Sequence, residues 1–460
     1  METETKRLRT LPTPAAAAAA ENAAVVVALV LGNIDILREI LLLLDAPSHL
    51  VRAALVSKDW LRAAADPSFL RRFRARSPPR LLGFLASFAS PPTNPPVEGA
   101  AFTRFVPLPH PPELDVAARL VDAAFNGGAG GQTKGLVVGC RNGRVLVKHG
   151  GYYGKRYSVR TPLRPSSAVG PTTVARPSVV PPQRVRDLME PDVRCAQLEL
   201  LPYPGVDDRR DALSGFGDLT NCSTDRYDER IMQQAVYLRQ GSGWIAHVSP
   251  PMHFPVPVDD NQEPYSVLVG GRWLCMTTVL DWIVVFDLDT GDFSSVMFPN
   301  GVSVAPHGDD HMLARAGDTG IYLVHVKGVE LHVWFREMGN YAAVWERVQT
   351  VDLPRVFRGH VYRGFWNYVY ALDSNMLNWD LMEYFDRAWC YRVRIHAVGD
   401  DAEFVFLTLG CHGGVFLLDV KRRTVQKVLQ TSLENDGGPL CGISAFMMPW
   451  PPVFPALEQT

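Results

Sequence analysis

The chain has 460 residues, of which 47% are hydrophobic and 20% charged, and its formal net charge is −2. This length is typical of two or three compact domains. The near-neutral charge gives no electrostatic basis for binding nucleic acid or an anionic membrane surface, and no stretch reaches the roughly 20 apolar residues of a transmembrane helix.

The N-terminal segment combines basic residues with an alanine run and an apolar stretch, a pattern similar to a signal peptide. Glu21 and Asn22 interrupt the apolar part, and the segment continues directly into a helix signal. Signal peptides keep an uninterrupted apolar core followed by a cleavage site. We therefore interpret residues 1–30 as a disordered, alanine-rich tail.

Residues 31–76 have the hydrophobic periodicity of short helices, together with residues that typically start and end helices. Apolar residues recur at steps of three and four from Ile34 to Leu44, and Asn33 is placed to cap the first helix. Pro47 separates this helix from a second one, Ser57 can cap a third that carries Trp60, and Asp66 followed by proline starts a fourth. The sequence predicts three to four helices in a unit too small to be comfortably stable alone. We therefore expect a partner protein to cover part of its apolar surface.

Residues 77–134 form a Pro/Gly-rich connection that should hold the first strands and a short helix near residues 114–125. From residue 135 to 450 short β-type runs follow one another, many separated by hairpin turns such as Arg141-Asn142-Gly143 and Gly270-Gly271. Residues 451–460 complete the chain as a tail. We expect residues 135–450 to be the main body of an antiparallel all-β domain, joined by strands from residues 80–108. The expected strands are residues 135–140, 144–148, 157–160, 234–238, 244–248, 265–270, 272–276, 282–287, 320–326, 330–335, 368–373, 403–409 and 414–420.

A loose repeat runs through this body. If Asp287, His325, Asp373 and Asp419 are equivalent strand ends, the spacings are 38, 48 and 46 residues. Four-stranded propeller blades repeat at roughly 40 to 50 residues. We predict six blades, with seven as the alternative, and a pair of β-sandwiches stays open as a second all-β architecture.

Three short motifs suggest chemistry, and in each case a structural role is the simpler interpretation. Residues 127–135, GGAGGQTKG, have the lysine in the wrong place for a phosphate-binding loop. Residues 307–311, HGDDH, lack a further cluster at metal-ligand spacing. Residues 287–292, DLDTGD, lack the distal glutamate of a calcium loop and read as a hairpin turn.

Seven cysteines are spread over about three hundred residues without a C-x-x-C pair. They indicate reduced thiols in a cytoplasmic or nuclear protein. No metal, cofactor or catalytic residue is expected. Among the aromatic residues, the crowded segment 365–389 offers candidates for a binding surface, namely Trp366, Tyr368, Trp379 and Tyr384.

Residues 31–73 resemble the F-box. The matching features are the Ile-Leu-rich first helix, the Leu-Val stretch, the Val-Ser-Lys-x-Trp signature at residues 56–60 and the closing Asp-Pro-x-Phe at residues 66–69, while Gly32 stands where the family has proline. The resemblance implies docking on the Skp-type adaptor of a cullin-RING ubiquitin ligase. Carried over position by position, the adaptor-binding residues are Leu31, Ile34, Leu37, Ile40, Leu41, Pro47, Leu50, Val51, Leu55, Val56 and Trp60.

The remainder resembles the F-box-associated β-propeller of plant F-box proteins, through residues 80–87, 104–108, 114–125, 140–148 and 157–165. Together the two resemblances imply a non-catalytic substrate receptor, whose helices bind the adaptor and whose propeller binds an unknown target protein. Two alternatives remain open: a propeller hydrolase or carbohydrate-binding protein with a coincidental helical leader, and a scaffold that acts without the ligase.

Overall fold

The computed structural model divides the chain into two compact units, residues 1–80 with 447–460 and residues 81–446. We call them the helical unit and the β-rich unit and describe each by itself. The expected tails, residues 1–30 and 451–460, lie outside the described residues. The structure describes residues 32–44, 47–77, 80–89, 101–127, 133–141, 143–149, 156–163, 196–201, 214–219, 221–224, 229–233, 235–240, 243–248, 250, 252–255, 266–277, 281–302, 310–340, 342–361, 365–367, 369, 392–410, 413–431 and 438–448.

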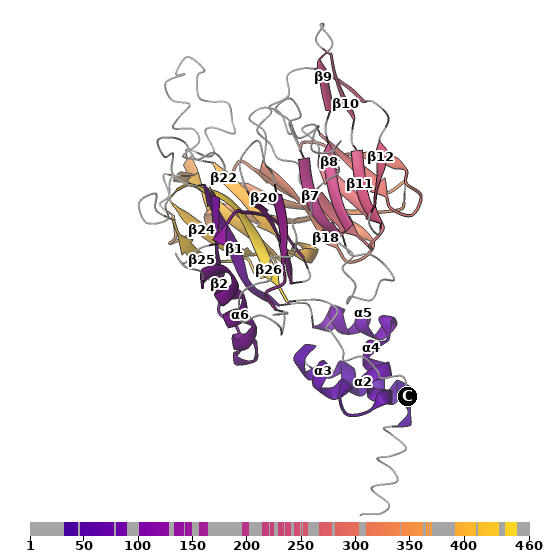
Figure 1. Cartoon of the computed structure of the whole chain (residues 1–460). Coiled ribbons are helices and arrows are strands. Elements are labelled where there is room, and N and C mark those ends of the chain that lie inside the picture. Colours follow the sequence, from indigo (N-terminus) through magenta and orange to yellow (C-terminus); the bar gives the residue numbers. More distant parts are fainter. Residues whose placement is uncertain are drawn as a thin grey trace, which may run out of the picture. The chain divides into compact units, whose positions relative to one another are not determined.

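Four short helices form the helical unit, as the sequence predicts (Figure 1). They are α2 (Ile34–Leu42), α3 (Pro47–Ala54), α4 (Lys58–Ala65) and α5 (Pro67–Arg76). The side chains of Asn33, Ser57 and Asp66 accept hydrogen bonds from the first backbone N–H groups of α2, α4 and α5. Each cap satisfies donors that a helix leaves unpaired at its start, so the three predicted helix starts are confirmed.

One small hydrophobic core holds these helices together. Leu37 and Leu41 of α2, Leu50 of α3 and the rings of Phe69 and Phe73 of α5 are almost completely buried in it. Trp60, Leu44 and Leu70 pack against this core while remaining partly exposed. The four helices therefore share a single apolar interior, even though none of them is longer than ten residues.

Antiparallel strands make up most of the β-rich unit. Four of its sheets have four strands: β26-β1-β2-β3, β14-β15-β16-β17, β18-β19-β20-β21 and β22-β23-β24-β25. A fifth sheet, β4-β5-β6, has three strands. Their bounds are β1 Leu81–Ala89, β2 Ala101–Pro107, β3 Thr133–Lys134, β4 Leu136–Arg141, β5 Arg144–His149, β6 Arg156–Arg160, β14 Ser266–Val269, β15 Trp273–Thr277, β16 Trp282–Asp287, β17 Phe293–Met297, β18 Asp310–Ala316, β19 Gly320–Lys327, β20 Glu330–Glu337, β21 Glu346–Asp352, β22 Val393–Val398, β23 Phe404–Leu409, β24 Gly414–Asp419, β25 Thr424–Gln430 and β26 Leu440–Met447.

Shorter sheets lie between β6 and β14 in the sequence. They are the pair β7–β8, the pair β11–β12 and the three-stranded sheet β13-β10-β9, with β8 lying beside β11. Their bounds are β7 Ala196–Leu201, β8 Ser214–Leu219, β9 Asn221–Thr224, β10 Glu229–Gln233, β11 Ala235–Gln240, β12 Gly243–Val248 and β13 Met252–Pro255. The predicted strands near residues 234–238 and 244–248 are therefore confirmed as the hairpin β11–β12.

The first sheet joins the two ends of the β-rich unit. Strand β26 lies next to β1, and the backbone N–H of Ala89 donates to the carbonyl of Pro439 at 3.0 Å. The ring of Phe446 on β26 meets Phe105 on β2 edge-on at 6.0 Å. Because strands from residues 81–134 and 440–447 share one sheet, the chain closes on itself and leaves no open end of the fold.

Neighbouring sheets contact one another through the strands that come first in each sheet. Strand β14 lies beside β18 and β18 beside β22, while β4 lies between β1 and β7. Phe84 on β1 contacts Phe406 on β23 with ring centroids 4.9 Å apart, which joins the last sheet to the first. This sequential, closed order of antiparallel sheets is a β-propeller and differs from the two facing sheets of a sandwich.

The number of blades differs from the prediction. Within the described residues the structure has five blade-like sheets, not the six or seven expected. The estimate rested on equating four strand ends, of which His325 is not equivalent to the others that can be compared, while Asp373 lies outside the described residues. Asp287 and Asp419 end the third strands of their sheets, whereas His325 lies within the second strand of its sheet, β19. The sequence analysis therefore took His325, a polar residue within a strand, for a strand end. For this reason the spacing of 38 to 48 residues was not the true repeat of the blades.

A second difference concerns the strand expected at residues 368–373. Residues 365–367 and 369 are helical, and the rest of that stretch lies outside the described residues. Phe365, Trp366 and Val369 are all buried in one hydrophobic cluster. Their spacing of one and three residues fits a helix face, whereas alternate residues would share a face in a strand.

The remaining helices are short, apart from α6 (Asp115–Asn126), which confirms the helix predicted near residues 114–125. Asn126 ties α6 to β2, because its amide accepts from the N–H of Phe105 at 3.1 Å and donates to the carbonyl of Phe105 at 2.9 Å. Besides the helical residues 365–367 and 369, the described part of the unit has the short helices η1 (Pro112–Leu114), α8 (Leu353–Val356) and η4 (Asp400–Ala402). In the described part of the chain no helix is long and apolar enough to cross a membrane.

Candidate functional site

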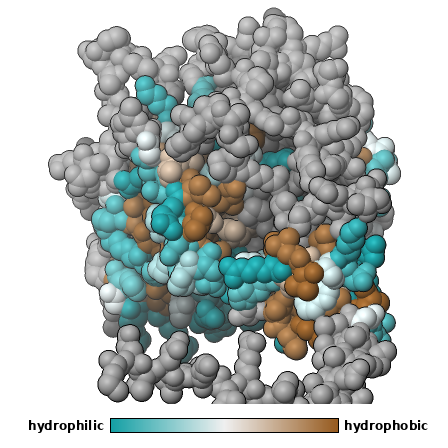
Figure 2. Space-filling view, turned by 60° about the horizontal axis from the view of Figure 1, so that its bottom comes forward, coloured by the Kyte–Doolittle hydropathy of each residue, from teal (hydrophilic) through white to brown (hydrophobic). Residues whose placement is uncertain are grey.

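The helical unit carries a concentration of exposed apolar side chains. Leu43, Leu55 and Val56 are 64–69% exposed, and Ile34 and Ile36 are exposed to a smaller extent. Ile34 and Ile36 lie in the first turn of α2, Leu43 ends α2, and Leu55 and Val56 form the turn after α3. Figure 2 shows hydrophobic side chains gathered on this unit, at the lower right. We call these five residues the helical apolar surface.

The residues predicted to bind an adaptor fall into three groups. Ile34, Leu55 and Val56 belong to the helical apolar surface. Leu37, Leu41 and Leu50 are 0–1% exposed and form the core of the unit, so they support the surface from inside. The others, Ile40, Pro47, Val51 and Trp60, are partly buried, and Leu31 lies outside the described residues.

Ile36 and Leu43 are exposed apolar residues that the sequence analysis did not single out. Both lie in the apolar run around α2, where Leu41, Leu42, Leu43 and Leu44 are consecutive. A helix buries only one stripe of its surface, at steps of three and four. An unbroken run of four leucines exceeds that stripe and must leave at least one outside, which was a usable signal.

Trp60 is held by both a cap and a core contact. Its backbone N–H donates to the Ser57 hydroxyl at 3.3 Å, and its ring packs partly against the helical core. Ser57 and Trp60 directly follow the exposed Leu55 and Val56 in the sequence. The Val-Ser-Lys-x-Trp signature therefore combines an exposed valine, a helix cap and a half-buried ring within five residues.

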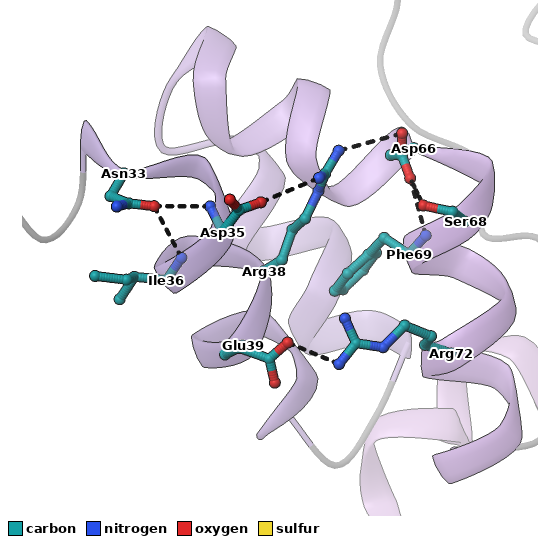
Figure 3. A network of polar contacts seen from close by, with 9 residues as sticks. All are labelled: Asn33, Asp35, Ile36, Arg38, Glu39, Asp66, Ser68, Phe69 and Arg72. Carbon is teal, nitrogen blue, oxygen red and sulfur yellow. Dashed lines mark hydrogen bonds and ion pairs between the residues drawn. The ribbon is translucent and has the colours of Figure 1, made fainter.

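Ion pairs outside the core fix α2 against α5 (Figure 3). Arg38 contacts Asp35 at 3.4 Å and Asp66 at 3.3 Å, and Arg72 contacts Glu39 at 2.7 Å. Exposed pairs of this kind contribute little stability individually, with typical values of about 0–1 kcal/mol. Their clear consequence is geometric, because they orient the helix that carries Ile34 and Ile36.

Asp66 lies where this network meets the start of α5. Its carboxylate accepts hydrogen bonds from the Ser68 hydroxyl and from the Phe69 N–H at 2.9 Å. The Ser68 hydrogen bond, followed by the Phe69 N–H and the Arg38 charge, lowers the pKa of Asp66 below its ordinary value. Asp66 is therefore ionised, and its cap is intact, throughout the neutral pH range.

The proposed substrate-binding aromatics are not assembled into a surface by the described residues. Trp366 is 6% exposed and packs in the core against Phe357 and Phe365, with ring centroids 5.8 and 5.1 Å away. Its ring is therefore closed off from a surface ligand, because the helical turn directs it inward. Tyr368, Trp379 and Tyr384 lie outside the described residues.

The HGDDH motif contributes its last two residues to the start of β18. Asp310 accepts the N–H of Ile395 at 2.6 Å and so links β18 to β22, and burial raises the pKa of its carboxyl to about 6. His311 is buried and lies opposite His325, which in turn stacks on His332 across β19 and β20. In the described ranges no three His, Cys, Asp or Glu side chains converge on a point where a metal ion could bind.

The other two motifs also have structural roles in the described residues. The DLDTGD segment is the turn between β16 and β17, as predicted, with Gly291 at a φ of 78°, which favours glycine. From GGAGGQTKG, Thr133 and Lys134 form β3, which pairs with β2. Residues 128–132 lie outside the described residues.

Two family models match the sequence. A model described as F-box domain matches residues 33–72. A model described as F-box protein AT5G49610-like, beta-propeller, matches residues 136–454. No curated protein matches the chain.

Two solved structures illustrate the similarity, which is at low sequence identity. One is the β-propeller domain of Cps50 (Swd1) from Myceliophteria thermophila, with 8% identity, 77% of this chain and 89% of that chain covered, and a TM-score of 0.36. Another is a putative 6-phosphogluconolactonase from Bacteroides fragilis, with 11% identity, 76% and 83% covered, and a TM-score of 0.33. Neither resemblance enters the functional argument.

Proposed function

The chain belongs to the F-box proteins with an AT5G49610-like β-propeller, and from this membership we propose that it is a substrate-recognition subunit of a Skp-cullin-F-box ubiquitin ligase. In this proposal the helical unit binds the Skp-type adaptor, and the propeller binds a target protein. The chain performs no chemistry itself; it holds the target near the ubiquitin-loaded enzyme and so raises its effective concentration there. We place this function in the cytoplasm or the nucleus.

The observation that carries the adaptor-binding part is the helical apolar surface. Five large apolar side chains stand exposed beside a core that is already closed by Leu37, Leu41 and Leu50. Covering the exposed part of each would contribute roughly 1 kcal/mol, taken from about 25 cal/mol per Å² of apolar surface. Exposed apolar side chains gathered on so small a unit support this proposal, because such surfaces are typical of protein-binding sites.

The decisive test separates this surface from the core behind it. Replacing Leu37 or Leu41 would disrupt the core and would not distinguish lost folding from lost binding. We therefore choose the double variant Leu55→Glu with Val56→Glu, whose side chains are largely exposed. It should fold normally but lose co-purification with the Skp-type adaptor, because charged groups would be placed in an apolar contact.

The matched control is Val116→Glu, an exposed apolar residue on α6 of the β-rich unit. This variant should retain full adaptor binding. Undiminished adaptor capture by the Leu55/Val56 double variant would refute the docking proposal. Capture of the adaptor without a cullin would instead indicate a scaffold that acts outside the ligase.

Target recruitment needs a second measurement. Proteins bound to the intact chain during proteasome inhibition are compared with those bound to the Leu55/Val56 double variant. A target should bind both forms but become ubiquitinated only with the intact chain. Ubiquitination that is the same with both forms would refute the receptor role.

A further inference from the structure

The β-rich unit has its own concentration of exposed apolar side chains. Five large apolar residues are exposed on its described part, and four of them lie between residues 282 and 348. Met297 and Val344 are the most exposed of these four, at 64% and 79%, followed by Val348 and Trp282. The fifth, Val116, lies apart from them in sequence, on α6.

Contacts link several of these residues across two neighbouring sheets. Trp282 on β16 lies directly opposite Met297 on β17. The indole N–H of Trp345, which precedes β21, donates to the carbonyl of Met297 at 2.7 Å. Val344 is the residue before Trp345 in the chain. We call Trp282, Met297, Val344 and Trp345 the rim patch.

The rim patch is anchored to the core of the β-rich unit without a bound partner. Trp345 packs against the hydrophobic core between the two sheets, and its polar atom is already hydrogen-bonded to Met297. Val348 is turned out nearby by a register shift between β20 and β21, since Val333 pairs with Gln349 and Trp334 with Arg347. A surface that needs no ordering loses less entropy on binding than a flexible one does.

The strand beneath the patch has a further property of a binding site. β17 is the outermost strand of its sheet in the described residues. Its Phe293 and Val296 are half-buried, while Ser294, Ser295 and Met297 are exposed. An outer strand presents backbone N–H and C=O groups along its outer edge, and an extended peptide can pair with them. On β17 the Met297 carbonyl already accepts from Trp345, so the peptide would pair with the groups that precede it.

The chain segment that carries Trp282 and Met297 is acidic. Residues 281–302 contain four aspartates and no lysine or arginine. Arg272 offsets two of these charges. It donates to both carboxylate oxygens of Asp287, at 3.0 and 2.7 Å, and lies 3.3 Å from a carboxylate oxygen of Asp289. The hydrogen bonding from Arg272 lowers the pKa of Asp287. Glu346 follows Trp345 and is exposed, and the cation nearest in sequence, Arg347, lies over the ring of Trp334 at 5.6 Å.

We propose that the rim patch and the outer edge of β17 bind an extended segment of another protein, in which apolar side chains are flanked by lysine or arginine. The apolar side chains cover Trp282, Met297 and Val344, the segment pairs with β17, and its basic flanks face the acidic border. That the bound protein is the target of the ligase rests on the proposed function; the binding itself does not.

The test uses the intact chain and three labelled peptides of twelve residues. The first has alternating valine and threonine between two lysines at each end, the second has glutamates at the ends, and the third has serine in place of valine. Fluorescence anisotropy measures their affinities. The first peptide should bind at least tenfold more tightly than either of the others, and its affinity should fall in 0.5 M salt, because ions screen exposed charges.

Surface variants then locate the binding site. Met297→Glu combined with Val344→Glu should weaken binding of the first peptide at least tenfold, while Val116→Glu should leave it unchanged. Glu346→Lys should weaken binding of the first peptide severalfold. It should also reduce the difference in affinity between the peptide with lysine ends and the peptide with glutamate ends. All four substituted residues are exposed, so the variants should fold, which circular dichroism and thermal unfolding verify.

Three results would overturn the proposal: no binding of the first peptide, equal binding of basic and acidic peptides, or binding that the Met297/Val344 variant leaves intact. Sedimentation of the chain detects a different occupant, because a dimer abolished by the same variant would make the patch a contact between two copies.

Adaptor capture is measured on the same protein. A chain that captures the adaptor but binds no peptide refutes only the rim patch, and a chain that binds the peptide but not the adaptor refutes only the ligase role.

Discussion

The helical unit and the β-rich unit treat their apolar residues in different ways. Between residues 32 and 77 the helical unit exposes five large apolar side chains, and the described part of the β-rich unit exposes the same number between residues 81 and 446. The first unit has one small core, whereas the second has several clusters and is closed by β26. Small domains bury a smaller fraction of their surface. The helical unit thus exposes more large apolar side chains for its size than the β-rich unit does, which is what the proposed docking on an adaptor requires.

The largest expected effect tests the closure of the β-rich unit. Phe446 on β26 is fully buried and contacts Phe105, so Phe446→Ala should leave a cavity in the closing sheet. Substitutions of this kind cost about 3–5 kcal/mol in free energy of unfolding. Urea unfolding of the β-rich unit measures this cost, and Met297→Ala at an exposed position should change it by less than about 0.5 kcal/mol. Equal effects of the two variants would show that β26 is not part of the fold's core.

The next effect divides the helical unit into core and surface. Leu41→Ala should destabilise the unit by about 2–5 kcal/mol, because Leu41 is fully buried. Leu55→Ala should leave stability almost unchanged yet weaken adaptor binding by about tenfold, which corresponds to about 1.4 kcal/mol. Hydrogen exchange of α2 and α3 and the adaptor affinity are measured on both variants. If Leu55→Ala also exposed the backbone of α3 to exchange, the comparison between core and surface would fail.

Local signals made the helical unit predictable. Caps and period act within one or two turns, so Asn33, Ser57 and Asp66 could be placed from the sequence and are confirmed. Which apolar residues are buried depends on how helices pack, and this is set by contacts between distant residues. The stripe from Ile34 to Leu44 therefore mixed core residues with exposed ones.

The β-rich unit was predictable in its hairpins and much less in their arrangement. Glycine turns identified β4–β5, β14–β15 and β19–β20, because positive φ favours glycine wherever it occurs. The pairing of β26 with β1 spans most of the chain and leaves no local trace. The rim patch was missed for a similar reason, since Met297 and Val344 become neighbours only through the Trp345 hydrogen bond.

A smaller effect is expected at the cap beside the helical apolar surface. Ser57→Ala removes the acceptor for the Trp60 N–H, and loss of an N-cap costs about 0.5–2 kcal/mol. Thermal unfolding of the helical unit should shift downward, and Ser57→Asp should restore it because aspartate is also a good cap. A drop in adaptor affinity without any loss of stability would mean that Ser57 contacts the adaptor directly.

The last effect concerns acidity, to which the two units should respond differently. Asp310 and His396 lie at one junction of the propeller, because Asp310 accepts the N–H of Ile395, the residue before His396. Burial raises the pKa of Asp310 from 3.8 to about 6 and lowers that of His396 from 6.5 to about 4. In the helical unit the pKa of Asp66 is lowered instead, so its contribution is present above its unfolded pKa, near 4, and is lost only as the pH falls further.

The two propeller groups act in opposite directions over nearly the same pH range. Between about pH 6 and 4 the folded chain holds a proton on Asp310 that the unfolded chain releases, so acidification stabilises the fold through this group. Between about pH 6.5 and 4 the unfolded chain protonates His396 and the folded chain does not, so acidification destabilises it. Asp310→Asn should therefore make stability fall more steeply as the pH is lowered, and His396→Gln should make it fall less steeply. Urea unfolding at pH 7, 6, 5 and 4.5 measures how the free energy of unfolding of each variant changes with pH. Asp66 of the helical unit contributes no change in this range. The same pH dependence in both variants would therefore show that neither Asp310 nor His396 is coupled to folding.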